Sequence, residues 1–153
     1  MSGYVLERSL VVPGELPAVF AFFKRPENLE RITPPWLNFR ILSTSTPEVR
    51  AGTRIRYRLK LNGIPLTWES LISRYEDNVL FVDEQVKGPY RRWVHLHGFR
   101  EVPGGVEVSD RVDYALPFGP LGTLAHTLMV RRQLDGIFGY RRRVMEDVFG
   151  RVP

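Results

Sequence analysis

Two histidines and an aspartate are the side chains of this chain whose types and spacing best suit chemistry. His95 and His97 are separated by one residue, so a strand through them would place both imidazoles on one face. Asp110 lies beyond the turn signal Gly104-Gly105, and strand pairing outward from that turn brings it beside both histidines. A buried carboxylate orients a neighbouring imidazole and raises its pKa, which makes the ring a donor or base for a bound polar group.

This group of His95, His97 and Asp110 allows three interpretations. It could contact a ligand or act in general acid–base catalysis, or it could be a hydrogen-bonded cluster that only fixes the sheet and traps water. Two imidazoles and a carboxylate on one face could also hold a metal ion, but His-X-His is a short and common motif. We therefore predict no metal site and assign no catalytic residue, while keeping these three as candidates.

Aromatic side chains flank the three polar candidates in the expected sheet. Trp93 shares a face with both histidines, and Tyr114 shares one with Asp110. On the C-terminal segment, Arg131 lies at helical spacing from apolar residues and could anchor an anionic ligand head. The alternative is ordinary core for the aromatic residues and a solvated Arg131–Asp135 pair on the helix flank. The predicted ligand-binding set is Trp68, Phe81, Trp93, His95, His97, Asp110, Tyr114, Leu128, Arg131 and Phe138.

The first third of the chain mixes strands with short helices. Apolar residues in Tyr4–Val12 predict a strand, and those in Glu15–Lys24 recur at helical spacing. Pro26 opens a second short helix through Ile32, since proline is favoured in a first helical turn. Trp36–Ser43 is predicted as the next strand.

The middle of the chain alternates apolar and polar residues with the period of a strand. Thr53–Leu61 places arginines and a lysine at every second position, which predicts one buried and one solvated face. Asn62-Gly63 follows, the strongest short hairpin signal. Short connectors predict an antiparallel meander for the strands that follow, which are Pro65–Tyr75, Val79–Val86, Arg91–Val102 and Val106–Leu116.

A long helix is predicted over Pro120–Phe149. Leu121, Leu124 and Leu128 share one side of it, while the later apolar residues fall on nearly the opposite side. Either the helix bends near 131–136, where Gly136 and the nearby Gly139 make a bend easy, or its first turns pack against something different.

This order of elements resembles the helix-grip superfamily of START-like lipid-transfer domains, plant pollen-allergen-type proteins and bacterial polyketide cyclase/dehydrase-like proteins. The resemblance covers essentially the whole chain. It implies an α+β fold in which a curved antiparallel sheet of about seven strands wraps around the long C-terminal helix, with two short helices after the first strand. Its more specific residues are Phe81-Val82-Asp83-Glu84-Gln85, Gly88-Pro89-Tyr90, Trp93, His95, His97, Phe99, Asp110-Arg111-Val112, Tyr114 and Leu116-Pro117-Phe118-Gly119.

The resemblance also implies a deep cavity between helix and sheet that holds a hydrophobic or amphipathic small molecule. Its members share a fold rather than a chemistry, so no catalytic residue carries over. In such a fold the segment Leu116–Gly122 would lie near a cavity mouth, either as a gate or as a rigid connection.

Length and composition bound the remaining possibilities. The 153 residues fit one domain spanning 1–153, and the lack of cysteine excludes disulfides and thiol nucleophiles. No apolar run approaches the ~20 residues of a membrane helix, and the N-terminus lacks a signal-peptide core, so a cytoplasmic protein is expected. The net charge of +5 comes without a nucleic-acid-binding motif, and no phosphate loop or dinucleotide fingerprint occurs, so neither nucleic acid nor a cofactor is expected.

Two functions from different classes remain. The leading hypothesis is non-catalytic binding or transport of a lipid, an isoprenoid or a polyketide-like molecule. The alternative is a cofactor-independent cyclase, dehydratase or hydrolase that uses His95, His97 and Asp110 in the same cavity.

Overall fold

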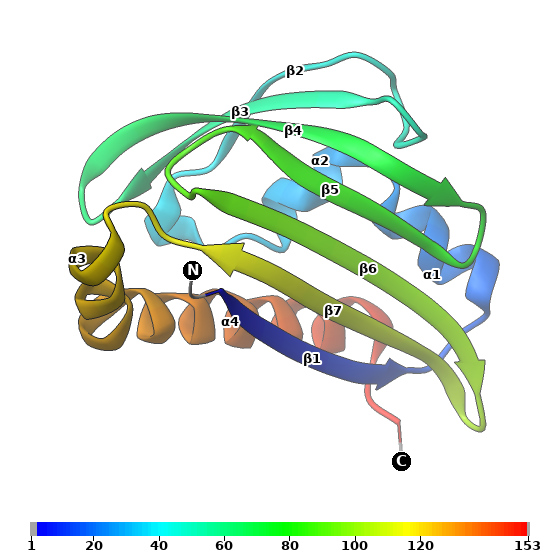
Figure 1. The fold of residues 1–153 in the computed structure, drawn as a ribbon. Coiled ribbons are helices and arrows are strands. Elements are labelled where there is room, and N and C mark those ends of the chain that lie inside the picture. Colours follow the sequence, from blue (N-terminus) through cyan, green and yellow to red (C-terminus); the bar gives the residue numbers. More distant parts are fainter. Residues whose placement is uncertain (1–2, 153) are drawn as a thin grey trace.

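The computed structural model describes residues 3–152, which form a seven-stranded antiparallel sheet curved around a long C-terminal helix (Figure 1). The strand order is β1-β7-β6-β5-β4-β3-β2, a meander whose last strand pairs with the first. The predicted helix-grip fold is therefore confirmed. The strands are β1 (Tyr4–Val12), β2 (Arg40–Thr44), β3 (Arg54–Leu61), β4 (Ile64–Glu76), β5 (Leu80–Lys87), β6 (Arg92–Val102) and β7 (Gly105–Ala115).

The sheet follows the alternation in the sequence. Along β3, Arg54, Arg56 and Arg58 are exposed, whereas Ile55 and Leu59 are buried. All five alternate residues of β7 from Val106 to Tyr114 are buried. The β3–β4 turn places Asn62 and Gly63 at φ 52° and 79°, the left-handed pair that a two-residue hairpin requires.

The prediction of a strand over Trp36–Ser43 is wrong in its first half. Pro35–Leu37 forms a short 3-10 helix, and β2 begins only at Arg40. Consecutive prolines favour this turn because the ring fixes φ and lacks an N–H. Asn38 then ends it with φ 49°, a left-handed conformation that asparagine tolerates.

The two short helices, α1 (Leu16–Phe23) and α2 (Pro26–Arg31), follow β1 as predicted. They pack at one end of the concave face, beneath the ends of the central strands (Figure 1). Phe20 of α1 is 1% exposed and contacts the rings of Tyr75, Phe81 and Phe99. This end of the molecule is therefore closed by aromatic packing.

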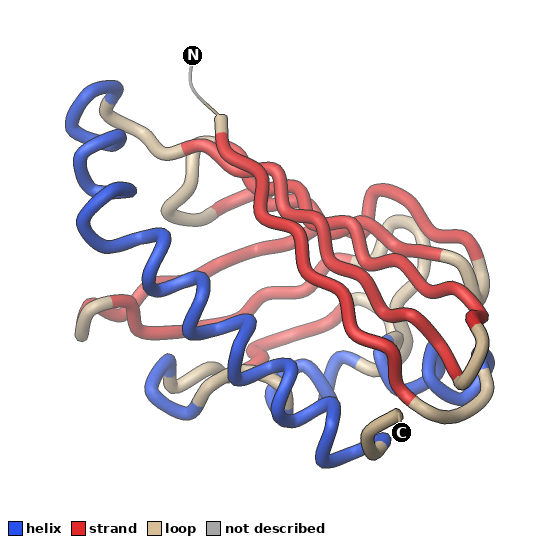
Figure 2. Tube along the Cα trace, turned by 90° about the horizontal axis from the view of Figure 1, so that it is seen from below, coloured by secondary structure: helices blue, strands red, loops and turns tan. Residues whose placement is uncertain are grey.

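The C-terminal helical segment runs obliquely across one face of the sheet (Figure 2). It consists of α3 (Gly119–Ala125), a π-helical turn η2 (His126–Val130) and α4 (Arg131–Phe149). The irregularity thus precedes the predicted bend at 131–136. A wider turn fits here because the His126 ring stacks on Tyr4 at 3.6 Å and its Nε2 is hydrogen-bonded to the Tyr114 hydroxyl at 2.7 Å.

The buried core is divided into two apolar clusters. The larger one joins α1 and α2 to residues of β1, β3, β4, β5, β6 and β7, and it includes Met145 of α4. The smaller one joins Leu6, Val112 and Tyr114 to Leu134 and Phe138 of α4. Within residues 3–152, no helix is long and apolar enough to cross a membrane.

The aromatic packing of Phe20 generates a stability prediction. Phe20→Ala should lower the free energy of unfolding by about 3–5 kcal/mol, because it removes a fully buried ring and leaves a cavity. Phe118→Ala is the matched control, since Phe118 is 80% exposed and should change stability by less than about 0.5 kcal/mol. Urea denaturation followed by tryptophan fluorescence measures both, and equal losses would contradict the assignment of Phe20 to the core.

Candidate functional site

A cavity lies between the concave face of the sheet, the N-terminal helices and α4. Its volume is about 170 Å³. Most of its wall is aliphatic or aromatic, with Phe22, Leu37, Trp68 and Ile137 as examples from different elements. Such a lining suits a largely apolar ligand with few polar anchors.

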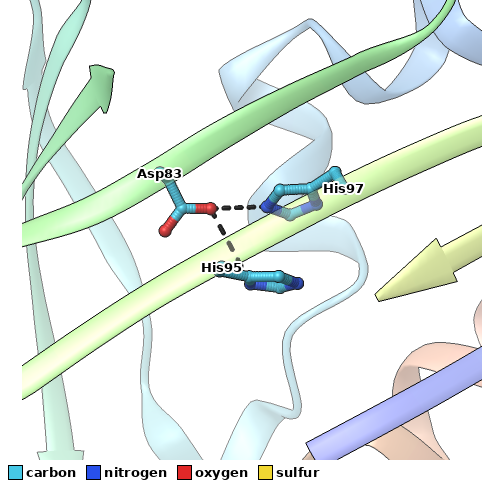
Figure 3. A group of neighbouring side chains, drawn as sticks. All are labelled: Asp83, His95 and His97. Atoms are coloured by element: carbon cyan, nitrogen blue, oxygen red, sulfur yellow. Dashed lines mark hydrogen bonds and ion pairs between the residues drawn. The ribbon is translucent and has the colours of Figure 1, made fainter. Parts of the chain in front are cut away.

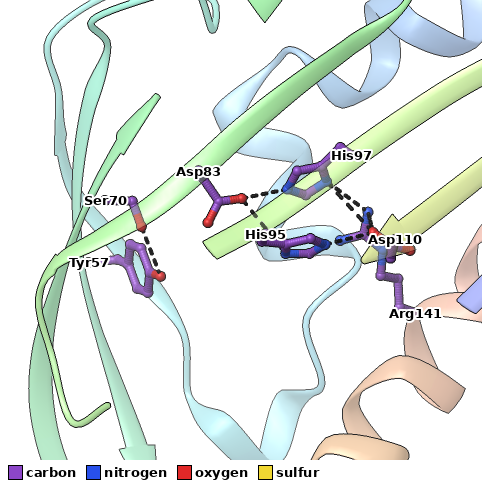
Figure 4. Close-up of polar contacts among 7 residues, drawn as sticks. All are labelled: Tyr57, Ser70, Asp83, His95, His97, Asp110 and Arg141. Atoms are coloured by element: carbon purple, nitrogen blue, oxygen red, sulfur yellow. Dashed lines mark hydrogen bonds and ion pairs between the residues drawn. The ribbon is translucent and has the colours of Figure 1, made fainter. Parts of the chain in front are cut away.

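Polar side chains gather on one part of this wall (Figure 4). Asp83 of β5 faces His95 across the strand pair, and His97 of β6 faces Asp110 of β7. Arg141 projects from α4 toward the same group (Figure 4). Three adjacent strands and the helix therefore contribute to a single buried network.

Each histidine is paired with its own carboxylate. His95 Nε2 lies 2.8 Å from Asp110 Oδ1, and His97 Nε2 lies 2.5 Å from Asp83 Oδ2. The two imidazoles stack with their centroids 3.7 Å apart. Both aspartate–histidine pairs are thus held in fixed orientations against each other.

Arg141 supplies the positive charge that this network needs. Its guanidinium lies 3.1 Å from Asp110 Oδ1, and both side chains are more than nine-tenths buried. Burial opposes ionisation of Asp110, but the charge of Arg141 and the hydrogen bond from His95 outweigh it and hold the pKa well below the usual range. Burial likewise opposes ionisation of Asp83, whose pKa is nevertheless lowered by the hydrogen bond from His97 and by the electrostatic effects of His95, His97 and Arg141. Both carboxylates are therefore ionised at neutral pH.

The surroundings of His97 fix its protonation. Burial first, and then the neighbouring His95 and Arg141, lower its pKa to about 4, against the opposing effect of Asp83. A neutral imidazole carries one N–H, and the ionised Asp83 places that proton on Nε2. Nδ1 then accepts from Arg141 Nη2 at 3.4 Å, so both ring nitrogens are used.

Two polar atoms are left without a hydrogen-bond partner. The Oδ1 oxygen of Asp83 and the Nδ1 nitrogen of His95 have no hydrogen-bond partner within residues 3–152; the nearest ion-pair contact of Nδ1 is to Asp83 Oδ2 at 3.7 Å. Neither atom is sealed in, because the buried unpartnered side-chain atoms of that range are Trp68 Nε1 and Arg141 Nε. Asp83 and His95 both line the cavity. A ligand there meets a free carboxylate oxygen beside a free imidazole nitrogen.

The polar network lies between the two apolar clusters and contacts an aromatic ring of each. The ring of Phe81, from the larger cluster, stacks on His97 at 4.3 Å, and His95 lies 5.7 Å from the ring of Phe138 in the smaller cluster. The order is therefore Phe81, His97, His95, Phe138. This continuous ring stack leaves the imidazoles little freedom to rotate.

Asp83, His95 and His97 also lie close enough together for a metal site, since one donor atom from each lies within 4.8 Å of the others (Figure 3). The sequence pattern suggested Asp110 in place of Asp83. The two imidazoles are nearly parallel, at 22°, so their lone pairs run side by side rather than converging on one point. Arg141 adds a positive charge 3.4 Å from His97. The geometry favours paired hydrogen bonds over cation binding.

The structure brings together part of the predicted ligand-binding set. Asp110 lies behind the histidines, where with Arg141 and Phe138 it lines a second cavity of about 140 Å³ between β1, β7 and α4. The lining of the main cavity contains Trp68, Phe81, Trp93, His95, His97 and Phe138.

Three predicted residues lie outside both cavity linings. Tyr114 is buried in the smaller apolar cluster and bonds to His126, while Leu128 is 68% exposed and Arg131 is exposed. For Leu128, the π turn at 126–130 changes the phase of the helix relative to the buried residues of α4. The alternative Arg131–Asp135 pair does not form, because Asp135 pairs with Arg8 of β1 at 2.5 Å.

Two central residues were absent from the predicted set. Asp83 shares a face with Phe81, but the sequence does not reveal whether that face is inward. Arg141 belongs to a buried stripe of α4 that consists of Leu134, Phe138, Arg141 and Met145. Spacing of four, three and four residues is a helical signal, and an arginine within such a stripe marks a buried charge.

A family model described as polyketide cyclase/dehydrase and lipid transport matches residues 12–137. The chain belongs to this family. The family description covers both ligand transport and cyclase chemistry, so it supports hydrophobic ligand binding or a cyclase role without choosing between them. No curated protein sequence matches the chain.

Solved structures share the fold of this family member. They include TTHA0849 from Thermus thermophilus, with TM-score 0.71 and 18% identity over 95% of both chains. The di-domain ARO/CYC StfQ from the steffimycin biosynthetic pathway has TM-score 0.75 and 14% identity over 97% of this chain and 50% of that one. Major latex-like protein 151 from Panax ginseng has TM-score 0.69 and 12% identity over 96% and 97%. At these identities the likeness shows the fold alone.

The lowered pKa of His97 predicts acid sensitivity. The unfolded chain takes up a proton on this histidine near pH 6.5, whereas the folded protein does so only at about 4. The contribution of His97 is therefore fully present above pH 6.5 and is lost as the pH falls to 4, at a cost of about 3 kcal/mol. Asp83 and Asp110 titrate below this window because their pKa values are lowered.

Urea denaturation at several pH values between 7 and 4 measures this effect. His97→Gln should show a shallower fall in the free energy of unfolding than the wild type, because glutamine keeps a donor and an acceptor but does not titrate. The pKa of His126 is also lowered by burial. His126→Gln is therefore the matched control, because it measures how much the loss of a different buried histidine changes the fall in the free energy of unfolding. Parallel curves for wild type and His97→Gln would refute the assignment.

Proposed function

We propose that this protein binds a small, largely apolar molecule in its main cavity and orients it through a hydrogen-bond donor that faces Asp83. The observation that carries the proposal is the free Oδ1 of an ionised carboxylate inside an otherwise apolar cavity. An ionised carboxylate oxygen accepts a ligand N–H or O–H in a charge-assisted hydrogen bond. His95 Nδ1 lies beside it as a second polar atom without a hydrogen-bond partner within residues 3–152.

The charges of the network favour a positively charged donor. Asp83 and Asp110 are both ionised, and Arg141 pairs with Asp110 alone within residues 3–152. The free oxygen therefore belongs to the carboxylate that Arg141 does not contact. An amine on an apolar body complements it better than an alcohol, and a carboxylic acid would be repelled.

Aromatic residues define the other end of the ligand site. Trp68 is flanked by Tyr57, Tyr90 and Trp93 with ring centroids 5.3–5.8 Å away. Its Nε1 is enclosed by protein without a partner, so a ligand in the cavity does not reach it. Burial and the charge of Asp83 raise the pKa of Tyr57, so its hydroxyl remains a donor. A flat or aliphatic ligand with an acceptor at this end fits the wall.

Three matched probes test the orientation of the ligand. Naphthalen-1-ylmethanamine, naphthalen-1-ylmethanol and 1-naphthoic acid share one apolar body, and isothermal titration at pH 7 measures their affinities. The amine should bind about tenfold more tightly than the alcohol, and the acid should bind most weakly, since about 1.4 kcal/mol separates each tenfold step. In Asp83→Asn the preference for the amine should disappear while the alcohol still binds.

The two parts of this proposal fail separately. If none of the three probes binds, the proposal that the cavity binds a ligand is wrong. If the acid binds as tightly as the amine, or if Asp83→Asn leaves the order unchanged, the cavity binds apolar molecules but Asp83 does not orient them. Glu84→Gln is the matched control, because Glu84 adjoins Asp83 on the opposite face of β5.

A second candidate function is proton transfer to or from the bound molecule. The free Nδ1 of His95, with Nε2 held by Asp110, is the arrangement of an oriented general base. The family description includes cyclases and dehydrases, whose chemistry needs such a group. His95 is then the catalytic candidate, and Asp110 with Arg141 orients it.

Deuterium exchange at the α-carbon of 1-tetralone, followed by proton NMR in D₂O, tests for an accessible base. The wild type should accelerate the exchange above buffer, and His95→Gln should abolish the acceleration. His126→Gln, which alters a histidine outside the cavity lining, should keep it. Binding without any acceleration leaves the binding proposal intact and eliminates His95 as a base.

A further inference from the structure

The most exposed apolar side chains of the molecule gather at one end. Phe118 is 80% exposed, Leu121 71%, Leu128 68% and Ile64 66%, and no other large hydrophobic residue within 3–152 reaches these values. Leu124 and Met129, at 55% and 48%, lie on the same helical segment. We call these six residues the apolar rim.

The apolar rim unites two parts of the chain that are distant in sequence. Five of its members belong to α3, η2 and the residue before them, while Ile64 follows the β3–β4 turn. Asn62 of that turn contacts Met129, with Nδ2 3.6 Å from Sδ. In Figure 1 the start of the helix and the β3–β4 turn meet at the left end of the molecule. Within the segment Leu116–Gly122, residues 118–121 are exposed, whereas Leu116 and Pro117 are partly buried and Gly122 is buried.

The charges around the apolar rim have a single sign. Neither residues 55–68 nor residues 114–134 contain an aspartate or glutamate. Lys60, Arg131 and Arg132 are exposed next to the rim in sequence, and none of them forms an ion pair within residues 3–152. The surface therefore combines exposed apolar side chains with unpaired positive charge.

We propose that the apolar rim docks on the surface of an anionic lipid bilayer. Apolar side chains of a helix insert at the boundary of headgroups and acyl chains, while lysine and arginine contact the anionic headgroups. A second copy of this chain fits less well, because a symmetric contact would bring Arg131 and Arg132 against the same positive charges of the other copy. Charge complementarity thus selects the membrane surface.

The position of the cavity makes this docking useful. Leu61 and Gln133 line the main cavity, are only partly buried and lie within a few residues of Asn62 and Met129. An apolar molecule could then pass between the bilayer and the cavity without crossing water. This last step rests on the proposed function, whereas docking itself does not.

Vesicle sedimentation tests the docking. Vesicles of phosphatidylcholine alone are compared with vesicles that contain about 30% phosphatidylglycerol, at low salt and at about 0.5 M salt, where charges are screened. The wild type should sediment with the anionic vesicles at low salt and much less under the other conditions. Leu121→Glu/Leu128→Glu should bind at least about tenfold more weakly, because it places two acidic groups in the headgroup region.

The control places the same charges elsewhere. Leu42→Glu/Val79→Glu changes two side chains that are each 47% exposed and lie away from the rim, and it should bind vesicles like the wild type. The proposal is overturned if the wild type binds neither vesicle type, if both double variants bind equally, or if sedimentation velocity shows a dimer that Leu121→Glu/Leu128→Glu dissociates. Retained binding of the naphthyl amine by Leu121→Glu/Leu128→Glu would separate a failure of docking from a failure of ligand binding.

Discussion

The ion pair between Arg141 of α4 and Asp110 of β7 determines how the helix lies on the sheet. Both groups are buried, and a buried charge is tolerated only when its partner is in place. The pair therefore fixes the rotation of α4 and brings Leu134, Phe138 and Met145 onto the sheet with it. It also separates the two cavities, since both residues line the smaller one and Arg141 lines the larger one as well.

A mainly apolar core around this pair would be the more stable arrangement for a protein that only had to fold. Replacement of buried ion pairs by hydrophobic residues is often neutral or stabilising. Here two carboxylates, two imidazoles and a guanidinium interrupt the core and divide it into two clusters. These groups bond to one another, and Asp83 keeps one oxygen free toward the cavity. That remaining acceptor links the stability of the fold to the recognition of a ligand.

The two ends of the molecule differ in a way that fits one path for an apolar ligand. Phe20, Phe23 and Phe99 close the end near α1. The opposite end exposes the apolar rim and bears unpaired positive charge. The polar network lies between them, so a ligand that entered beside the rim would meet the aromatic wall and Asp83 before the closed end.

Local sequence patterns were sufficient for most of the fold and for part of the site. Alternation placed His95 and His97 on the inner face of β6, and the Gly104-Gly105 turn set the register that pairs His97 with Asp110. Both features depend on neighbouring residues of one hairpin, so periodicity reports them directly. The strand prediction failed in its first half because the conformational restriction imposed by Pro34 and Pro35 outweighed the apolar pattern of the residues that follow.

Only the tertiary structure decided which groups from other elements join this hairpin. Asp83 became part of the site because pairing with β6 turned its face inward, which β5 alone does not reveal. Arg141, rather than Arg131, is the cationic partner because Arg141 belongs to the buried stripe of α4 that packs on the sheet, whereas Arg131 is exposed. The sequence by itself determined which residues share a face within an element. The rotation of the helix on the sheet depends on contacts between distant segments, and those exist only once the chain has folded.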